Sequence, residues 1–278
     1  MSKGISVIIP VYNCEATIRE TLDSVKDIAD EIIVVHDGYC YDRTLEICEE
    51  YGARVYSQHH KGRSAFTFAT GLKKAKYDWI LKLDDDESLS KTLQNNIKKL
   101  IKTKKYDAFS FIHPLWDGKK MITKTWPRKT ALVRKNTIRY FGFPGMDMNI
   151  PTKGKVYPTK YIMKHKPLTN QDVGWEDYKK KVLGKYLHSQ VEYMFKKFTD
   201  FPRYGYKFTD FPTRIRLRKK YPILFGMPYA VAAFFKHLFY DGAVNEGKIG
   251  VETCVKSFIY NLYLNILIKE KKKCLKKD

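Results

Sequence analysis

Residues 78–87 read Asp-Trp-Ile-Leu-Lys-Leu-Asp-Asp-Asp-Glu, so a mainly apolar run passes directly into four consecutive acids. The apolar part is typical of a strand that is covered on both faces. Like charges about 4 Å apart repel by about 1 kcal/mol in bulk water, and by more near a protein surface. A divalent cation would relieve that repulsion. The alternative is a solvated turn in which Asp86 or Glu87 caps a helix that begins near Ser90.

The segment before this strand alternates between strand and helix patterns. Short apolar runs predict strands, and apolar positions at helical spacing, with Asp42 and Ser64 as caps and Gly52 as a helix end, predict the connections. The predicted strands cover residues 5–11, 31–35, 53–56 and 78–83, and the helices cover 15–28, 42–52 and a stretch from 64. This order predicts an α/β fold with a parallel sheet and right-handed crossovers.

Chemically distinctive residues follow three of these strands. Tyr12 follows the first strand, Asp37 the second, and the acidic run the fourth. Ligands of open α/β sheets bind beyond the carboxyl ends of the strands, so we expect these residues at one site. Asp37 suits a hydrogen bond to a base or ribose, or equally a turn formed with Gly38.

Two common phosphate-binding motifs are absent from the sequence. There is no GxGxxG after the first strand and no GxxxxGK[ST] anywhere, which argues against a nicotinamide dehydrogenase and a P-loop NTPase. We therefore expect phosphate charge to be met by a metal ion together with cations such as Lys61 and Arg63.

Three stretches together carry a family resemblance. They are Ile5-Ser-Val-Ile-Ile-Pro-Val-Tyr-Asn13, Glu31-Ile-Ile-Val-Val-His-Asp-Gly38 and Trp79-Ile-Leu-Lys-Leu-Asp-Asp-Asp-Glu87. In order and spacing, residues 4–90 resemble family-2 inverting glycosyltransferases. Glu50-Tyr-Gly-Ala-Arg-Val-Tyr56 adds a resemblance to the lipopolysaccharide-core glucosyltransferase-like branch. His36 replaces a common Asp, and Gly62-Arg-Ser-Ala65 lacks the Asn usual in that branch.

The resemblance implies a GT-A fold, a Rossmann-like, mostly parallel sheet flanked by helices. It also implies Mn²⁺ or Mg²⁺ and a nucleotide-sugar donor, with a UDP-sugar favoured. The metal ligands would be Asp86, Asp84 and His165. The nucleotide-sugar contacts, which include the cations Lys61 and Arg63 named above, would be Pro10, Tyr12, Asp37, Lys61, Arg63, Asp84, Asp85 and Arg128.

An inverting transferase needs a general base for the acceptor hydroxyl. Asp147, in Gly142-Phe-Pro-Gly-Met-Asp147, lies downstream of Trp126-Pro-Arg128, where the resembling branch carries an acid. Asp177, in Trp175-Glu-Asp177, resembles the base of other family-2 enzymes but lies at a helix start, where acids are common. We favour Asp147 and keep Asp177 as the alternative.

The chain has a net charge of +22, with dense basic runs at residues 214–220 and 269–277. We expect a catalytic domain over 1–212, with a nucleotide-sugar half (1–113) and an acceptor half (114–212), and a basic amphipathic helical extension over 213–278. The apolar stretch from Pro222 is too short to span a membrane. The extension is expected to lie on an anionic membrane surface, to pack on the sheet, or both.

Five scattered cysteines and the absence of a charged-then-apolar leader predict a cytoplasmic protein, peripheral on the inner face of the membrane. The leading hypothesis is metal-assisted sugar transfer to a lipid-linked or cell-envelope glycan acceptor. A nucleotidyltransferase is the nearest other enzyme class. A nucleic-acid-binding module would rest on charge alone, because no RNA- or DNA-binding motif is present, so we expect no nucleic-acid partner.

Overall fold

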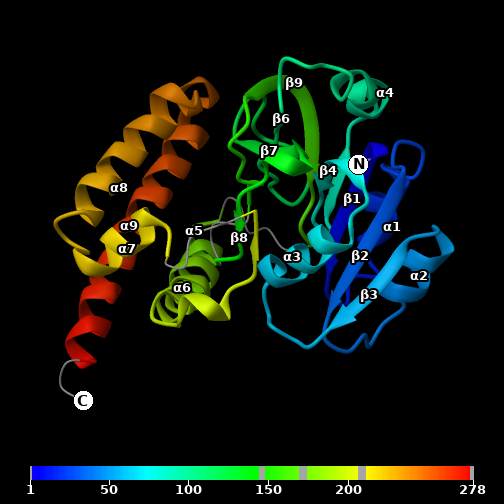
Figure 1. Cartoon of the computed structure of the whole chain (residues 1–278). Coiled ribbons are helices and arrows are strands. Elements are labelled where there is room, and N and C mark those ends of the chain that lie inside the picture. Colours follow the sequence, from blue (N-terminus) through cyan, green and yellow to red (C-terminus); the bar gives the residue numbers. More distant parts are fainter. Residues whose placement is uncertain (1, 144–147, 169–173, 206–210, 276–278) are drawn as a thin grey trace. The chain divides into compact units, whose positions relative to one another are not determined.

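The computed structural model describes residues 2–143, 148–168, 174–205 and 211–275. The chain forms two compact units (Figure 1). The first comprises Met1–Pro114, Arg128–Leu168 and Phe201–Lys207, and the second comprises Leu115–Pro127, Thr169–Asp200 and Phe208–Asp278. This division does not coincide with the expected boundary at residue 212.

An eight-stranded sheet forms the centre of the first unit, in the order β3-β2-β1-β4-β7-β6-β9-β5. The first four strands are parallel, β7 runs antiparallel to its neighbours, and β9 pairs parallel with β6 and antiparallel with β5. A two-stranded antiparallel pair, β8 and β10, accompanies the sheet. The strands are β1 (Ser2–Val11), β2 (Glu31–Asp37), β3 (Arg54–Gln58), β4 (Tyr77–Lys82), β5 (Glu87–Leu89), β6 (Ala108–Ile112), β7 (Arg128–Arg134), β8 (Tyr140–Phe141), β9 (Val156–His165) and β10 (Arg203–Tyr204).

Helices cover both faces of this sheet. One hydrophobic cluster joins alternate residues of β1 with side chains of α1 (Ile18–Asp23), α2 (Thr44–Glu50) and α4 (Lys91–Leu100). A second cluster, on the opposite face, joins Ile8 with Phe68 and Leu72 of α3 (Ser64–Lys74). Because side chains alternate along a strand, the continuous apolar run in β1 serves both clusters.

The predicted alternation of strands and helices in the first hundred residues is confirmed, together with several local signals. Asp42 accepts a hydrogen bond from the Thr44 N–H (3.0 Å) at the start of α2, and Gly52 ends that region with a φ of +70°. Ser90 caps α4 by accepting a bond from the Leu93 N–H (3.3 Å). The cap of α4 is therefore Ser90 rather than Asp86 or Glu87.

The second unit is helical. A continuous helical stretch comprises α5 (Trp175–Asp177), a π-helix (Tyr178–Tyr186) and α6 (Leu187–Met194), and it packs against α9 (Gly247–Cys274). The Tyr178 hydroxyl donates to the Lys256 carbonyl, and Glu192 pairs with Lys271 (2.9 Å). These contacts explain why residues 175–194 belong with the C-terminal helices. The other described helical segments of this unit are α7 (Thr213–Lys220), α8 (Gly226–Phe235), a π-helix (Lys236–Tyr240) and 3₁₀ turns at Phe198–Asp200 and Ala243–Glu246. A further 3₁₀ turn, at Lys135–Thr137, lies in the first unit.

The buried side of α9 includes polar residues. Val251 and Ile266 are exposed, whereas Asn265 is fully buried. Arg218 of α7 is itself buried, and its guanidinium donates to the Asn265 Oδ1 (2.7 Å) and to the Asn261 Oδ1 (2.9 Å). Asn265 is thus accommodated in the interior because its oxygen accepts a hydrogen bond from an arginine of another helix. No helix within the described ranges is long and apolar enough to cross a membrane.

Candidate active site

The four acids after β4 lie in four different environments. Glu87 begins β5 and is 2% exposed, while Asp84, Asp85 and Asp86 are partly exposed in the turn before it. The turn is closed by the Glu87 N–H, which donates to the Asp84 carbonyl (3.1 Å), and by the Asp84 N–H, which donates to the Glu87 Oε2 (2.8 Å). The run is therefore a folded turn with one acid directed into the interior.

Glu87 is neutralised by the protein itself. The buried Lys129 Nζ of β7 lies 2.6 Å from both carboxylate oxygens, and the His113 Nε2 donates to Oε1 at 2.6 Å. Burial alone would raise the pKa of Glu87, but the Lys129 ammonium and the His113 hydrogen bond hold it well below 4.5. Glu87 is therefore an ionised structural residue.

Asp84 is bound by lysines as well. Its Oδ2 accepts from Lys129 Nζ (2.8 Å), and its Oδ1 lies 3.5 Å from the buried Lys82 Nζ of β4. Burial acts to raise the pKa of Asp84, but the two ammonium groups lower it overall. Among the described residues no group of three His, Cys, Asp or Glu side chains could hold a metal ion. The expected trio of Asp84, Asp86 and His165 therefore does not form a ligand cluster, because Asp84 is committed to lysines.

Asp85 is turned toward α1. Its carboxylate is hydrogen-bonded to the Cys14 thiol, and its carbonyl accepts from the Thr21 hydroxyl (3.0 Å). Burial, together with the charges of Asp86 and Asp84, raises the pKa of Asp85 to about 7. Burial also raises the pKa of the Cys14 thiol, which is therefore unreactive at neutral pH.

Asp86 and His165 lie together at the end of the sheet. The β5–β9 pairing places His165 opposite Glu87, and the His165 Nε2 lies 3.5 Å from the Asp86 Oδ2. The Lys166 N–H donates to the Asp86 carbonyl (2.9 Å), and the His165 ring stacks on His113 with centroids 4.9 Å apart. Two of the three predicted metal ligands are thus adjacent, although they are 79 residues apart in the chain.

Aromatic rings gather beyond the ends of β1 and β2. Tyr12 is half exposed, and its ring centroid lies 5.8 Å from His36 and 5.1 Å from His60. The Asn13 N–H donates to the His36 Nε2 (3.4 Å), so the Nδ1 is the nitrogen that donates to the Gly38 carbonyl (3.1 Å). These two bonds hold His36 as a buried ring beside Tyr12.

Asp37 anchors the loop after β3. It is 5% exposed, and it accepts from the backbone N–H groups of Lys61 (2.8 Å) and Gly62 (2.6 Å). The His60 ring and the Gln58 amide also approach the carboxylate, at 3.3 Å and 3.4 Å. A base or ribose could reach Asp37 only by opening one of these bonds. These bonds hold the loop that follows β3 against Asp37.

The remaining predicted contacts occupy different positions. Pro10 is buried in β1, Lys61 is exposed with its ammonium 6.0 Å from the Phe66 ring, and Arg63 immediately precedes α3. Arg128 is bonded within the sheet, where its guanidinium donates to the Ser110 carbonyl of β6 and the Thr159 carbonyl of β9. Because successive strand residues face opposite sides, Lys129 rather than Arg128 contacts the acidic run.

Of the two candidate bases, only Asp177 lies within the described residues. Asp147 lies outside the described residues, so its position is not part of the structure presented. Asp177 is the last residue of α5 in the second unit and is partly exposed.

Sequence reasoning missed the cations that balance the acidic run. Lys82 interrupts an otherwise apolar strand, which is a recognisable signal because an unpaired lysine is rarely fully buried. Lys129 and His113 carry no such local signal, since they become neighbours of Glu87 only through the β6–β7 pairing and the β4–β7 pairing.

The first unit is thus a mostly parallel sheet flanked by helices, with an Asp–His pair and an aromatic surface beyond its strand ends. This sheet architecture is that of the GT-A fold class. The profile described as "Glycosyl transferase family 2" matches residues 6–166, more than half of the chain. The chain belongs to glycosyl transferase family 2.

The matches with individual proteins cover different shares of the chain. An uncharacterized glycosyltransferase of Rickettsia bellii is 39% identical over 110 residues, covering 39% of this chain and 36% of the relative, so the match spans about a third of that protein. Residues 1–349 of S. aureus TarS are similar with a TM-score of 0.43 and 14% identity over 97% of this chain and 91% of that one. Glucosyl-3-phosphoglycerate synthase from Mycobacterium tuberculosis, in complex with Mn²⁺, UDP and phosphoglyceric acid, has a TM-score of 0.43 and 16% identity over 59% and 71% of the two chains.

Proposed function

We propose that this chain transfers a sugar from a nucleoside-diphosphate donor to an acceptor hydroxyl, with inversion at the anomeric carbon and with assistance from Mn²⁺ or Mg²⁺. The observation that carries the proposal is the Asp86–His165 pair, whose donor atoms lie 3.5 Å apart. The neighbouring acids Asp84 and Glu87 are already neutralised by buried lysines.

The chemistry of this pair fits a divalent cation. Two donor atoms that share one ion at about 2.1 Å each lie roughly 3–4 Å from one another, as these atoms do. Mn²⁺ and Mg²⁺ accept carboxylate and imidazole donors, and Mg²⁺ sites commonly contain one or two protein carboxylates completed by substrate phosphates. When bound, such an ion would neutralise the charge that develops on the leaving diphosphate.

The protein residues around the pair would fix its geometry. Lys129 and Lys82 hold Asp84, and Lys129 and His113 hold Glu87, so the turn that carries Asp86 is anchored at both ends. Such anchoring keeps the Asp86 carboxylate in place without reorganisation when the donor binds.

The donor base is proposed to stack on Tyr12. This ring is half exposed and backed by His36, while Asp37 holds the loop that carries Lys61 beside it. Lys61 and Arg63 would contribute positive charge near the diphosphate. A uridine nucleotide is the favoured donor, and Asp147, with Asp177 as the alternative, is the proposed base that takes the acceptor proton.

The acceptor is proposed to be a lipid-linked or cell-envelope glycan, presented at the inner face of the membrane. Residues 213–278 carry fourteen Lys or Arg against five Asp or Glu, a difference of +9. This charge favours an anionic leaflet as the place where the chain meets its acceptor.

The test is the hydrolysis and transfer of nucleotide sugars with Mn²⁺, comparing Asp86→Ala with Asp78→Ala at the opposite end of β4. The Asp86→Ala variant should lose the metal-stimulated reaction while Asp78→Ala retains it. Full activity of Asp86→Ala in the presence of a chelator would refute the proposal. The product distinguishes enzyme classes, because a glycosyltransferase releases a nucleoside diphosphate whereas a nucleotidyltransferase acting on a nucleoside triphosphate releases pyrophosphate.

A further inference from the structure

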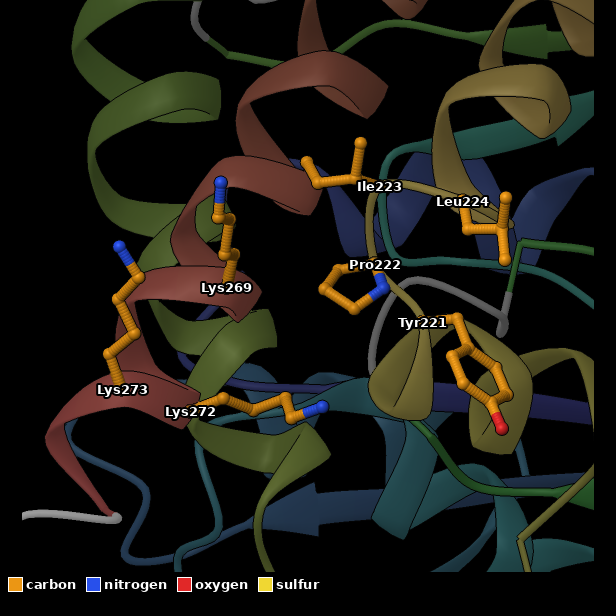
Figure 2. Close-up of a pocket in the computed structure, with 7 residues that line it drawn as sticks. All are labelled: Tyr221, Pro222, Ile223, Leu224, Lys269, Lys272 and Lys273. Atoms are coloured by element: carbon orange, nitrogen blue, oxygen red, sulfur yellow. The ribbon is translucent and has the colours of Figure 1, made fainter.

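A hollow of about 310 Å³ lies between the end of α9 and the segment that links α7 to α8. Lys269, Lys272 and Lys273 of α9 line one side, and residues 221–224 line the other (Figure 2). Ile223 is 42% exposed and Leu224 is 78% exposed. The hollow is therefore lined by three lysines on one side and by solvent-exposed apolar side chains on the other.

The lysines at the end of α9 differ in their partners. Lys271 pairs with Glu192 of α6 (2.9 Å), and Lys272 donates to the Lys220 carbonyl at the end of α7 (2.7 Å). Within the described part of the chain, Lys269 and Lys273 have no carboxylate partner. These two lysines lie one helical turn apart on the same side of α9, so their charges act together toward the hollow.

The apolar surface continues along α8. Backbone N–H groups of residues 225–227 donate to carbonyls four residues earlier, so the helical path already includes Leu224. Val231, Phe235 and Phe239 continue the stripe at helical spacing and are 44%, 52% and 62% exposed. An adjoining side of the helix packs on α9, where Ala230 is fully buried and Phe234 meets Phe258 edge to face. The helix thus presents apolar side chains both to α9 and to solvent.

We propose that the stripe from Leu224 to Phe239 rests in the headgroup–acyl boundary of an anionic bilayer, with lipid phosphates held by Lys269, Lys272 and Lys273. Charge complementarity selects this occupant, because the apolar stripe ends at a cluster of lysines. A second hollow, lined in part by Arg216, Lys219 and Lys220, lies on the other side of Lys272 and extends the positive surface. This inference deepens the proposed membrane association by fixing which face meets the lipid.

The first experiment measures sedimentation with vesicles of phosphatidylcholine, with and without phosphatidylglycerol. Wild type should bind the anionic vesicles, and binding should weaken as salt rises. The triple variant K269Q/K272Q/K273Q should bind about 150-fold more weakly, since three lysines at about 1 kcal/mol each give about 3 kcal/mol.

The matched control is K102Q/K104Q/K105Q, which removes the same charge from exposed lysines of the first unit. It should bind nearly as wild type. Equal losses in the two triple variants would show that net charge alone drives binding and would overturn the site.

The second experiment removes apolar surface. The variant L224S/F235S should lose at least tenfold in vesicle binding, whereas V156S/L168S, at exposed apolar positions of the first unit, should not. Thermal unfolding of each variant verifies that the fold is kept.

Three results would overturn the proposal. Binding of glycerol phosphate as tight as that of vesicles would identify a soluble phosphate as the ligand. A dimer without lipid that L224S/F235S dissociates would identify a second copy of the chain. Unchanged vesicle binding of L224S/F235S would exclude insertion of the stripe. The transferase proposal is tested separately, because Asp86→Ala should bind vesicles as wild type does.

Discussion

Replacing Lys129 with methionine would remove the cation that balances two carboxylates. Lys129 is 1% exposed, and its ammonium lies 2.6 Å from both oxygens of Glu87 and 2.8 Å from Asp84. Burial would lower the pKa of Lys129, but the two carboxylates raise it overall, so the wild-type group is charged. Removing one partner of a buried ion pair costs about 3–5 kcal/mol, because the other charge is left uncompensated. We expect K129M to lose that much free energy of unfolding.

The assay is urea unfolding followed by circular dichroism, with K160M as the control. Lys160 is exposed on β9, so its replacement should change stability by no more than about 0.5 kcal/mol. The double variant K129M/E87Q removes one of the two carboxylate charges that K129M leaves without their lysine, so it should recover about 1–3 kcal/mol relative to K129M. It also supplies a folded sample if K129M does not fold. The reasoning is refuted if K129M is no less stable than K160M, or if the double variant loses the sum of both single effects.

Three further predictions follow from the site. H165A should weaken Mn²⁺ affinity about 10–100-fold while leaving unfolding by urea nearly unchanged, and equal Mn²⁺ affinities by calorimetry would contradict its role. Of D147N and D177N, only the variant at the true base should lose turnover while still binding the donor; equal, near-wild-type turnover in both would remove both candidates. Burial alone would raise the pKa of Glu31. Hydrogen bonds from Ser6 and Lys76 and the ion pair with Arg54 outweigh burial, so the pKa lies below its ordinary 4.5. The ionised Glu31 should contribute fully to the free energy of unfolding above about pH 4.5, and this contribution should be lost as the pH falls through the lower pKa of the folded protein. In E31Q the free energy of unfolding should therefore fall less steeply at acid pH, which urea unfolding at a series of pH values measures.

The fold of the first hundred residues could be predicted because its signals are local. The apolar run in β1, the Asp42 cap and the positive φ of Gly52 each depend on neighbours within a few residues. The division into units could not be predicted, since residues 175–194 join α9 through contacts of distant side chains such as Glu192 with Lys271.

The candidate site shows the same contrast. The sequence placed Tyr12, Asp37 and the acidic run at one edge, because strand ends in a parallel sheet share an edge. It could not assign the four acids to separate roles, since those roles depend on lysines and histidines from other strands.

The sequence alone thus determined the parallel sheet, its ligand-binding edge and the family resemblance. All three depend on short-range apolar periodicity and on the order of motifs along the chain. Only the tertiary structure decided that Lys129 neutralises Glu87 and Asp84, that His165 meets Asp86, and that the apolar face of α8 stays exposed beside the lysines of α9. The physical reason is that charge balance and burial are set by groups that are close in space but distant along the chain, and pairing of strands and helices fixes those distances.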